Sequence, residues 1–241
     1  MRVAWVTGAS SGMGAASAEA LAADGFAVAL TGRRGASLEA VAERIRSKGG
    51  TVLSVPADVT DRGALQQAIA RINETLGEIE IVVLSAGVNT PRRHWDALTS
   101  SEVRAIVDVN LMGVVEPVEL VLPSMRRSGR GQFVLISSWS AWRFSPGAGV
   151  GYSASKQALA AVAETINAQE GVSGIRACHL CPGDVDTGFL AYRPQQPNED
   201  DRRHMLAATD VARAVSFVAT SPADVCINEL VITPTTNLAY R

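Results

Sequence analysis

The stretch Val3-Ala-Trp-Val-Thr-Gly-Ala-Ser-Ser-Gly-Met-Gly14 decides how this chain folds. Its apolar start predicts a buried strand, and the pattern of Met13–Ala23 that follows the glycines predicts a helix. Glycines let the backbone turn sharply and approach another group closely, and a helix N-terminus presents free N–H groups and a positive dipole end. An ordinary strand-to-helix turn would explain the glycines alone. The strand–turn–helix context favours a site for the phosphates of a dinucleotide.

Strand and helix patterns alternate along the rest of the chain. The strand-like runs are continuously apolar, which indicates a parallel sheet covered by helices on both faces. We therefore predict a single doubly wound α/β domain over residues 1–241, with about seven parallel strands in the order 3-2-1-4-5-6-7. The expected strands are Val3–Val6, Phe26–Leu30, Val52–Val55, Ile79–Leu84, Gln132–Ile136, Ile175–Cys181 and Leu230–Ile232, and the expected helices are Met13–Ala23, Leu38–Lys48, Gly63–Leu76, Ser101–Arg126, Ser153–Ala168 and Asp210–Ala219.

Two further local signals concern the helices and loops. Thr99-Ser-Ser-Glu102 has the spacing of a capping box at the start of the fourth helix. Gly188–Arg203 is a long irregular stretch with two prolines, and such a loop in a compact domain is more often functional than a linker. We expect residues 188–209 to form a lid over the substrate site.

Composition limits the classes of protein. The chain has 241 residues, of which 47% are hydrophobic, and a formal charge of −2, so we expect a globular protein with no nucleic-acid partner. No apolar run is long enough to span a bilayer, and the first strand begins too close to Met1 for a signal peptide. Three cysteines suit a reducing compartment, so we expect a cytoplasmic protein. Cys178 and Cys181 flank His179 in an expected strand; without a second ligand pair we interpret them as core residues and expect no metal.

The second strand ends in Thr31-Gly-Arg-Arg34. A carboxylate at this position would select the unphosphorylated cofactor by binding a ribose 2′-hydroxyl, and none is present. An arginine fork suits a 2′-phosphate and keeps its charge. The sequence therefore favours NADP(H) over NAD(H), with Arg33 as the first contact and Arg34 as the second. A solvated pair of arginines at a loop is the alternative.

Tyr152 and Lys156 lie four positions apart in an expected helix, so their side chains share one face. A free phenol has a pKa of about 10, and a neighbouring cation lowers that pKa, which makes the tyrosine a usable acid or base. Taken alone, the pair is more typical of an exposed helix surface. The nucleotide turn upstream favours the catalytic interpretation.

Taken together and in this order, the motifs resemble the short-chain dehydrogenase/reductase family over nearly the whole chain, which implies a Rossmann fold. The resemblance is carried by the Thr7–Gly14 turn, Asp58-Val59, Ala86-Gly87, Asn110, Ser138, the Tyr152/Lys156 pair and Pro182–Thr187. It implies a catalytic set of Asn110, Ser138, Tyr152 and Lys156. It also implies a cofactor-binding set, to which the arginines above are added: Gly8, Ser10, Ser11, Gly12, Met13, Arg33, Arg34, Asp58, Val59, Ala86, Gly87, Asn110, Tyr152, Lys156, Pro182, Gly183, Val185 and Thr187.

The chain departs from the family pattern at three places. Leu84-Ser-Ala-Gly87 replaces Asn-Asn-Ala-Gly, and Ile232–Asn237 replaces the common Asp-Gly-Gly ending. Ser138 and Tyr152 are one position further apart than is usual, which we interpret as an extra residue in Trp142–Gly151; Ser137 and Ser140 are the alternatives to Ser138. The C-terminal stretch is similar to the bacterial branch of NADP-dependent serine and 3-hydroxy-acid dehydrogenases.

The resemblance implies an NADP(H)-dependent oxidoreductase that interconverts a secondary alcohol, with a 3-hydroxy acid as one candidate, and the corresponding ketone. Tyr152 would exchange the proton, Ser138 would bind the carbonyl oxygen, and Lys156 would lower the pKa of Tyr152. A silent NADP(H)-binding sensor or scaffold is the alternative, and a sugar epimerase or dehydratase fits less well because little chain remains after Cys181. Relatives pair through long helices, which implies a homodimer or homotetramer.

The substrate pocket is less defined by the sequence. Five side chains lie near the strand ends where such folds bind ligands, although packing or exposure would also explain them: His94, Trp95, Trp139, Trp142 and Phe144. Arg193, Arg202 and Arg203 in the lid could pair with a substrate carboxylate, or they could be solvated charges.

Overall fold

Seven parallel strands form the central sheet of the computed structural model, which describes residues 1–236. The strand order is β3-β2-β1-β4-β5-β6-β9, so the predicted order is confirmed, with β9 as the expected seventh strand. The observed strands are β1 Val3–Thr7, β2 Ala27–Thr31, β3 Val52–Ser54, β4 Ile79–Leu84, β5 Gly131–Ile136, β6 Ile175–Pro182 and β9 Glu229–Ile232, and a separate small sheet pairs β7 Val185–Asp186 with β8 Leu206–Ala207.

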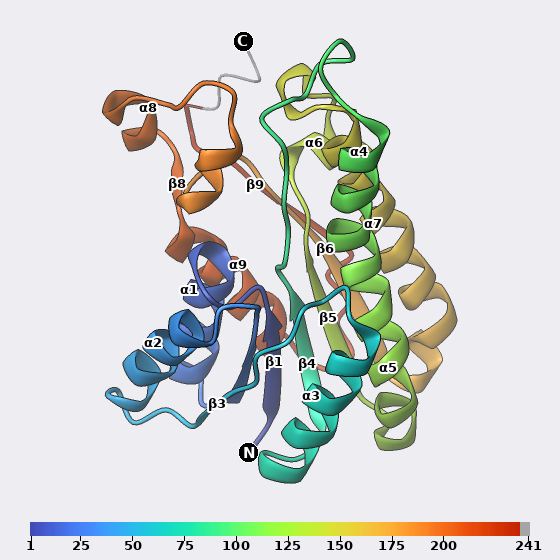
Figure 1. The fold of residues 1–241 in the computed structure, drawn as a ribbon. Coiled ribbons are helices and arrows are strands. Elements are labelled where there is room, and N and C mark those ends of the chain that lie inside the picture. The colour runs from blue at the N-terminus through green and yellow to red at the C-terminus, as the bar shows by residue number, and fades with distance from the viewer. Residues whose placement is uncertain (237–241) are drawn as a thin grey trace.

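Helices cover both faces of this sheet (Figure 1). Helices α1, α2 and α9 lie on one face and α3, α5 and α7 on the other. The helices are α1 Gly12–Ala23, α2 Gly35–Arg46, α3 Arg62–Thr75, α4 Ser100–Val107, α5 Gly113–Ser128, α6 Trp139–Trp142, α7 Val150–Glu170, α8 Glu199–Arg203 and α9 Ala208–Thr220, with a π-helical turn at Asp108–Met112 and 3₁₀ turns at Pro146–Ala148, Gly171–Ser173 and Gly188–Tyr192.

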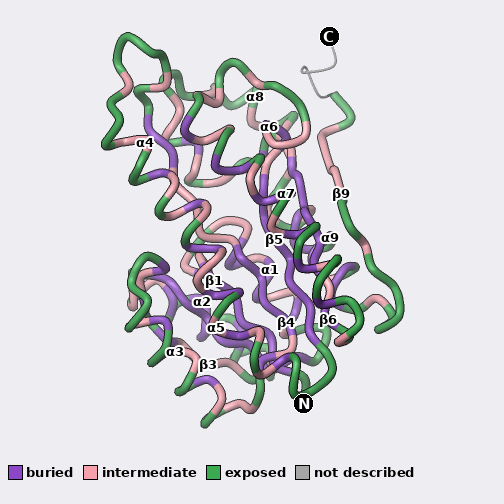
Figure 2. Tube along the Cα trace, turned by 90° about the vertical axis from the view of Figure 1, so that its right-hand side faces the viewer, coloured by how far each residue is buried: buried purple, intermediate pink, exposed green. Residues whose placement is uncertain are grey.

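The two faces of each strand explain the continuous apolar runs. In β1, Ala4 and Val6 pack into the core under α1, α2 and α9, whereas Val3 and Trp5 pack into the core on the other face. Figure 2 shows the result as a buried sheet inside more exposed helices and loops. Trp5 is fully buried, and its indole Nε1 donates to Thr31 Oγ1 of β2 at 2.8 Å, so its polar atom is satisfied inside the core.

The predicted helix Ser101–Arg126 is wrong in one respect. The segment is interrupted by the π turn Asp108–Met112, which carries the fully buried Asn110. The apolar spacing of the segment could not reveal this turn, because one wider turn leaves the pattern on both sides helical. The helix does begin with the predicted capping box, in which Thr99 and Glu102 each accept from the other's backbone N–H.

The segment 188–209 is more ordered than the sequence suggested. It contains a 3₁₀ turn, Gly188–Tyr192, the helix α8 and the short strand β8. A second capping box, formed by Asn198 and Asp201, starts α8, so the polar residues that read as loop are helix-capping residues. Its role as a lid stays a prediction. Asn237 of the C-terminal motif lies outside the described residues, and no helix within residues 1–236 combines the length and apolar character needed to cross a membrane.

Candidate active site

The glycine turn between β1 and α1 is packed too tightly for side chains. Gly8 has φ +65°, and a Cβ there would lie 2.6 Å from the backbone N of Ala86 at the end of β4. A Cβ on Gly14 would lie 2.4 Å from the Gly8 carbonyl oxygen. Gly12 has φ +56°, and a Cβ there would lie 3.4 Å from Thr187 Cβ. The turn therefore holds its backbone N–H groups at the carboxyl edge of the sheet, next to the segments that follow β4 and β6.

Helix α1 begins at this turn with no side-chain cap. Ser11 is the N-cap residue, and its hydroxyl makes no capping hydrogen bond, so the first N–H groups of α1 are available to an anion. The hydroxyls of Ser10 and Ser11 instead accept from Arg34 Nη2, each at 3.3 Å. Because a cation, two hydroxyls and a helix N-terminus meet here, the residues fit a phosphorylated dinucleotide.

The two arginines after β2 make different contacts. Arg34 contacts the phosphate turn, whereas Arg33 is exposed and lies 4.0 Å from the carboxylate of Asp58. Arg34 is therefore the arginine that contacts the turn, and the prediction that Arg33 is the first contact to a 2′-phosphate stays a prediction. Arg34 directly precedes α2 and is the N-cap residue of that helix, so the start of α2 fixes the position of its backbone.

Other predicted cofactor residues lie around the same edge. Val59 is buried against α5, where a Cβ on Gly113 would lie 2.7 Å from Val59 Cγ2. Val185 is buried in β7, and the Thr187 hydroxyl caps the following turn by accepting from Phe189 N at 3.3 Å. Met13 packs against the core under α1. Pro182 ends β6, and Gly183 N donates to the Ile232 carbonyl of β9.

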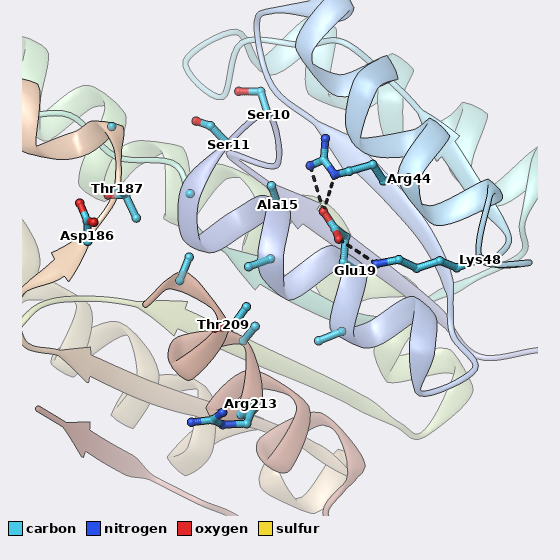
Figure 3. Close-up of a pocket in the computed structure, with 16 residues that line it drawn as sticks. Ser10, Ser11, Ala15, Glu19, Arg44, Lys48, Asp186, Thr187, Thr209 and Arg213 are labelled. Atoms are coloured by element: carbon cyan, nitrogen blue, oxygen red, sulfur yellow. Dashed lines mark hydrogen bonds and ion pairs between the residues drawn. The ribbon is translucent and has the colours of Figure 1, made fainter. Parts of the chain in front are cut away.

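A groove of about 790 Å³ extends from the phosphate turn along the outer side of α1 (Figure 3). Ser10, Ser11 and Thr187 lie at one end, and Glu19, held by Arg44 at 2.9 Å and Lys48 at 3.4 Å, lies further along α1. None of the predicted catalytic side chains lines this groove. The groove is therefore lined by Ser10, Ser11 and Gly12 of the phosphate turn and not by the reacting groups.

Tyr152 and Ser138 are brought together as the sequence predicts. Tyr152 lies in the first turn of α7, and Ser138 is the N-cap residue of α6, directly after β5. The Ser138 hydroxyl interacts with the Tyr152 phenol and favours its ionised form. Ser140 Oγ is 3.1 Å from Ser138 Oγ, while the buried Ser137 Oγ donates to the Lys156 carbonyl at 3.0 Å. The geometry therefore supports Ser138 over the two alternative serines.

The pKa of Tyr152 does not follow the sequence-based expectation. Burial raises this pKa, and it outweighs the lowering effects of Ser138, Arg93 and Arg193. Lys156 is not among the groups that lower it. The Lys156 ammonium donates instead to the Ile136 carbonyl oxygen at 2.8 Å. The expected lowering of the phenol pKa by Lys156 is therefore wrong, and burial holds Tyr152 in its protonated form.

Lys156 and Asn110 lie side by side behind Gly87. A Cβ on Gly87 would lie 3.5 Å from Asn110 Oδ1 and 3.6 Å from Lys156 Nζ, which are ordinary contact distances and place both side chains next to this residue. Asn110 Oδ1 accepts from Val88 N at 2.8 Å, and its Nδ2 donates to the Val88 carbonyl at 3.0 Å and to Ser155 Oγ at 3.1 Å. The amide is thus fully bonded and holds the end of β4 against α7.

Burial lowers the pKa of Lys156 from 10.5 to about 8, with a smaller opposing effect from Cys181.

Lys48 and Lys156 are the only lysines in the sequence, so the NMR spectrum of ¹³C-lysine-labelled protein has two Cε signals, and the Lys156→Met variant shows which of them belongs to Lys156. We expect the Lys156 signal to titrate with a midpoint near pH 8. A midpoint near 10.5 would show that the ammonium is solvated. Between these pH values the unfolded chain binds more protons at Lys156, so this residue makes stability rise with pH.

The predicted pocket residues divide into buried and exposed groups. Trp139 is buried and packs edge-to-face on Trp142 with ring centroids 5.0 Å apart. Trp95 and Phe144 are both 81% exposed, so they do not line an enclosed pocket. His94 is exposed, and its carbonyl accepts from Ala97 N and Leu98 N.

A ring cluster that the sequence did not single out approaches Tyr152. The Phe189 ring lies 5.8 Å from the Tyr152 ring and 5.2 Å from the Tyr192 ring. Arg93, from the loop after β4, donates to the Tyr192 carbonyl at 2.7 Å and acts electrostatically on Tyr152. Sequence reasoning missed Arg93, whose one signal was its place after a strand that ends at this edge of the sheet.

The cysteine–histidine stretch of β6 is buried as expected. Burial raises the pKa of Cys178 and of Cys181 to about 12, which keeps both thiols protonated. His179 Nδ1 lies 3.0 Å from Glu229 Oε1 of β9, and Cys181 Sγ is 3.5 Å from the same ring nitrogen. His179, Cys181 and Glu229 thus form a compact group, which the sequence did not anticipate because Glu229 is remote in the chain.

Comparisons with known proteins agree with this geometry. The family model described as "short chain dehydrogenase" matches residues 2–198. The chain is 34% identical to an uncharacterised oxidoreductase of Staphylococcus saprophyticus, with 97% of each covered. It is also 34% identical to a glycine betaine reductase of Emericella nidulans, of which it spans only 19%.

Among solved structures, the chain is similar to an alcohol dehydrogenase from the archaeon Thermococcus sibiricus complexed with 5-hydroxy-NADP. That structure has a TM-score of 0.86 and 31% identity, and the similarity covers 98% of this chain and 97% of the other. The match to the family model, the Rossmann topology and the grouping of the motif residues lead to one conclusion: the chain belongs to the short-chain dehydrogenase family of oxidoreductases.

Proposed function

We propose that the protein is an NADP(H)-dependent oxidoreductase that interconverts a secondary alcohol and the corresponding ketone, with Tyr152 as acid and base. The observation that carries this proposal is the half-buried Tyr152 phenol beside the Ser138 hydroxyl, at the same edge of the sheet as the glycine turn.

The side chains divide the work of carbonyl reduction. A bound nicotinamide supplies the hydride. Tyr152, kept protonated by burial, gives its phenolic proton to the substrate oxygen as negative charge develops there. Ser138 donates a hydrogen bond to the same oxygen. Lys156 and Asn110 hold the backbone around the phenol in place: Lys156 donates to the Ile136 carbonyl at the end of β5, and Asn110 donates to Ser155 Oγ of α7.

The cofactor is expected to bind across the carboxyl edge of β1, β2 and β4. The N–H groups of the Gly8–Gly14 turn and the start of α1 would bind the pyrophosphate. Arg34, Ser10 and Ser11 would bind a 2′-phosphate, with Arg33 and Asp58 beside them. The relative from Thermococcus sibiricus, whose structure contains 5-hydroxy-NADP, supports this choice.

Arg34→Gln is expected to reduce the preference for NADPH over NADH by roughly tenfold or more, because a charge-assisted bond to the 2′-phosphate is lost. Fluorescence titration of each cofactor gives the ratio of dissociation constants. Arg33→Gln should change that ratio less, since Arg33 lies against Asp58. Arg46→Gln, which removes an arginine paired with Glu39 on α2, is the charge control. An unchanged ratio in Arg34→Gln would exclude Arg34 from the phosphate site.

The proposed function is tested by following NADPH oxidation with a panel of neutral ketones and oxo acids. Turnover of at least one carbonyl supports an enzyme. Tight NADPH binding with no turnover on the whole panel would favour the sensor or scaffold.

We also propose that the protein is a homodimer or homotetramer and that it is located in the cytoplasm. Sedimentation of the purified protein measures the oligomeric state, and fractionation of cells measures the location.

A further inference from the structure

Arg93 ties together three loops at the mouth of the site. Its Nε donates to the Thr90 carbonyl at 2.9 Å, within the loop after β4. Its Nη1 donates to the Gly147 carbonyl at 2.8 Å, in the loop before α7, and its Nη2 to the Tyr192 carbonyl at 2.7 Å. Each nitrogen of the half-buried guanidinium thus faces a different loop.

The charge of Arg93 is not balanced by a carboxylate anywhere in residues 1–236. Its three acceptors are neutral carbonyls, and burial and the nearby Arg193 both lower its pKa. Four arginines of the loop after β4 and of the segment 188–209 differ, because each has an acidic partner: Arg92 pairs with Glu102, Arg193 with Asp184, Arg202 with Asp186 and Arg203 with Asp200. An unpaired, half-buried cation is costly unless an anion joins it.

Arg93 also shares its surroundings with the reacting phenol. The Arg93 side chain packs on Gly149, where an added Cβ would lie 2.9 Å from Arg93 Cβ, and α7 with Tyr152 starts at the next residue. The charge of Arg93 acts on Tyr152, and the acceptor residue Tyr192 belongs to the ring cluster that reaches Tyr152 through Phe189. The cation therefore lies close enough to the proton donor to act on it electrostatically.

We infer that Arg93 is a specificity-determining residue that binds the carboxylate of a small oxo-acid substrate while the ketone oxygen lies at Tyr152. This inference rests on the proposed function, whose substrate class it narrows. Three of the five guanidinium N–H groups are used by the loops, and the remaining two suit the two oxygens of a carboxylate. The lid arginines, which the sequence suggested for this role, already have carboxylate partners.

The test compares one acid with its neutral ester. With NADPH as cofactor, kcat/KM is measured for acetoacetate and for methyl acetoacetate. We expect the wild type to prefer the acid. Arg93→Gln should lower kcat/KM for the acid by roughly ten- to a hundredfold, mainly through KM, and change the ester by less than about threefold. Arg93→Lys should retain part of the preference, and Arg92→Gln, which alters an exposed neighbour paired with Glu102, should retain all of it.

Two results would overturn the inference. An equal loss for acid and ester in Arg93→Gln would mean that Arg93 only ties the loops, and a wild type without preference would mean that no carboxylate is bound. If Arg93→Gln does not fold, judged by circular dichroism, the acid-to-ester ratio of Arg93→Lys decides.

Failure of the proposed function is distinguishable from failure of this inference. If the wild type reduces no carbonyl in the panel, calorimetric titration of acetoacetate and its methyl ester into the NADP⁺-saturated protein still tests Arg93. Binding of the acid alone, lost in Arg93→Gln, supports the carboxylate site without catalysis. Equal binding of both ligands, or of neither, contradicts it.

Discussion

Replacing Tyr152 by phenylalanine is expected to lower kcat for ketone reduction by about a thousandfold, because the variant lacks the phenol that is proposed to protonate the nascent alkoxide. The phenol is half-buried beside Ser138, and the substitution removes only one oxygen from a ring that packs on Phe189. NADPH should still bind with a dissociation constant within about tenfold of that of the wild type, since the glycine turn is unchanged. Absorbance at the nicotinamide band gives kcat, and fluorescence titration gives the affinity.

Serine variants show which hydroxyl works with the phenol. Ser138→Ala should lower kcat by about a hundredfold, as the loss of one oxyanion donor does elsewhere. Ser137→Ala removes a hydroxyl that donates to the Lys156 carbonyl inside the core, so we expect this variant to lose stability while its kcat changes little.

Turnover by Tyr152→Phe at more than a tenth of the wild-type rate would rule out Tyr152 as the proton donor.

Gly8→Ala should abolish cofactor binding at NADPH concentrations that saturate the wild type, and it should destabilise the protein. An alanine at φ +65° is strained, and its Cβ would collide with the Ala86 backbone N at 2.6 Å. Gly129→Ala is the matched control, because Gly129 has φ +67° and no atom within 4 Å of its Cβ position. Both variants carry the same backbone strain, and only Gly8→Ala displaces the end of β4.

The difference between the two variants is the measured quantity. We expect Gly8→Ala to unfold several degrees below Gly129→Ala, since overpacking of this kind costs about 2 kcal/mol. Thermal unfolding followed by circular dichroism gives the difference. Equal melting temperatures, with NADPH affinity unaltered in both, would show that the turn can move away from Ala86.

The strands were predictable from the sequence because burial on both faces requires an apolar residue at every position. The observed strand Ile79–Leu84 begins and ends at the predicted residues. The capping box of Thr99 and Glu102 was predicted from the four residues Thr99–Glu102 alone. The grouping of the motif residues was predictable as well, because parallel strands place the segments that follow them at one edge of the sheet. Asn110 was expected in a regular helix, and the π turn that carries it has no distinct apolar pattern.

The remaining features depend on contacts that are remote in the sequence. Arg93 bonds the carbonyls of Gly147 and Tyr192, which are 54 and 99 positions away. Every residue has a backbone carbonyl, so the sequence does not indicate which carbonyls accept from Arg93. Which of Arg33 and Arg34 reaches the turn depends on where α2 begins. The raised pKa of Tyr152 depends on how deeply the phenol is buried, and spacing on a helix does not reveal this.

The side chain of Asn110 imitates a neighbouring peptide group. By accepting from Val88 N and donating to the Val88 carbonyl, it pairs with this residue as an adjacent strand would, just beyond the point where β4 leaves the sheet. A carboxylate of the same shape has no proton for that carbonyl, so aspartate cannot take its place. The loop that carries Arg93 therefore starts from a residue that is held in place. Only the few residues between Val88 and Arg93 are left to move relative to this anchor.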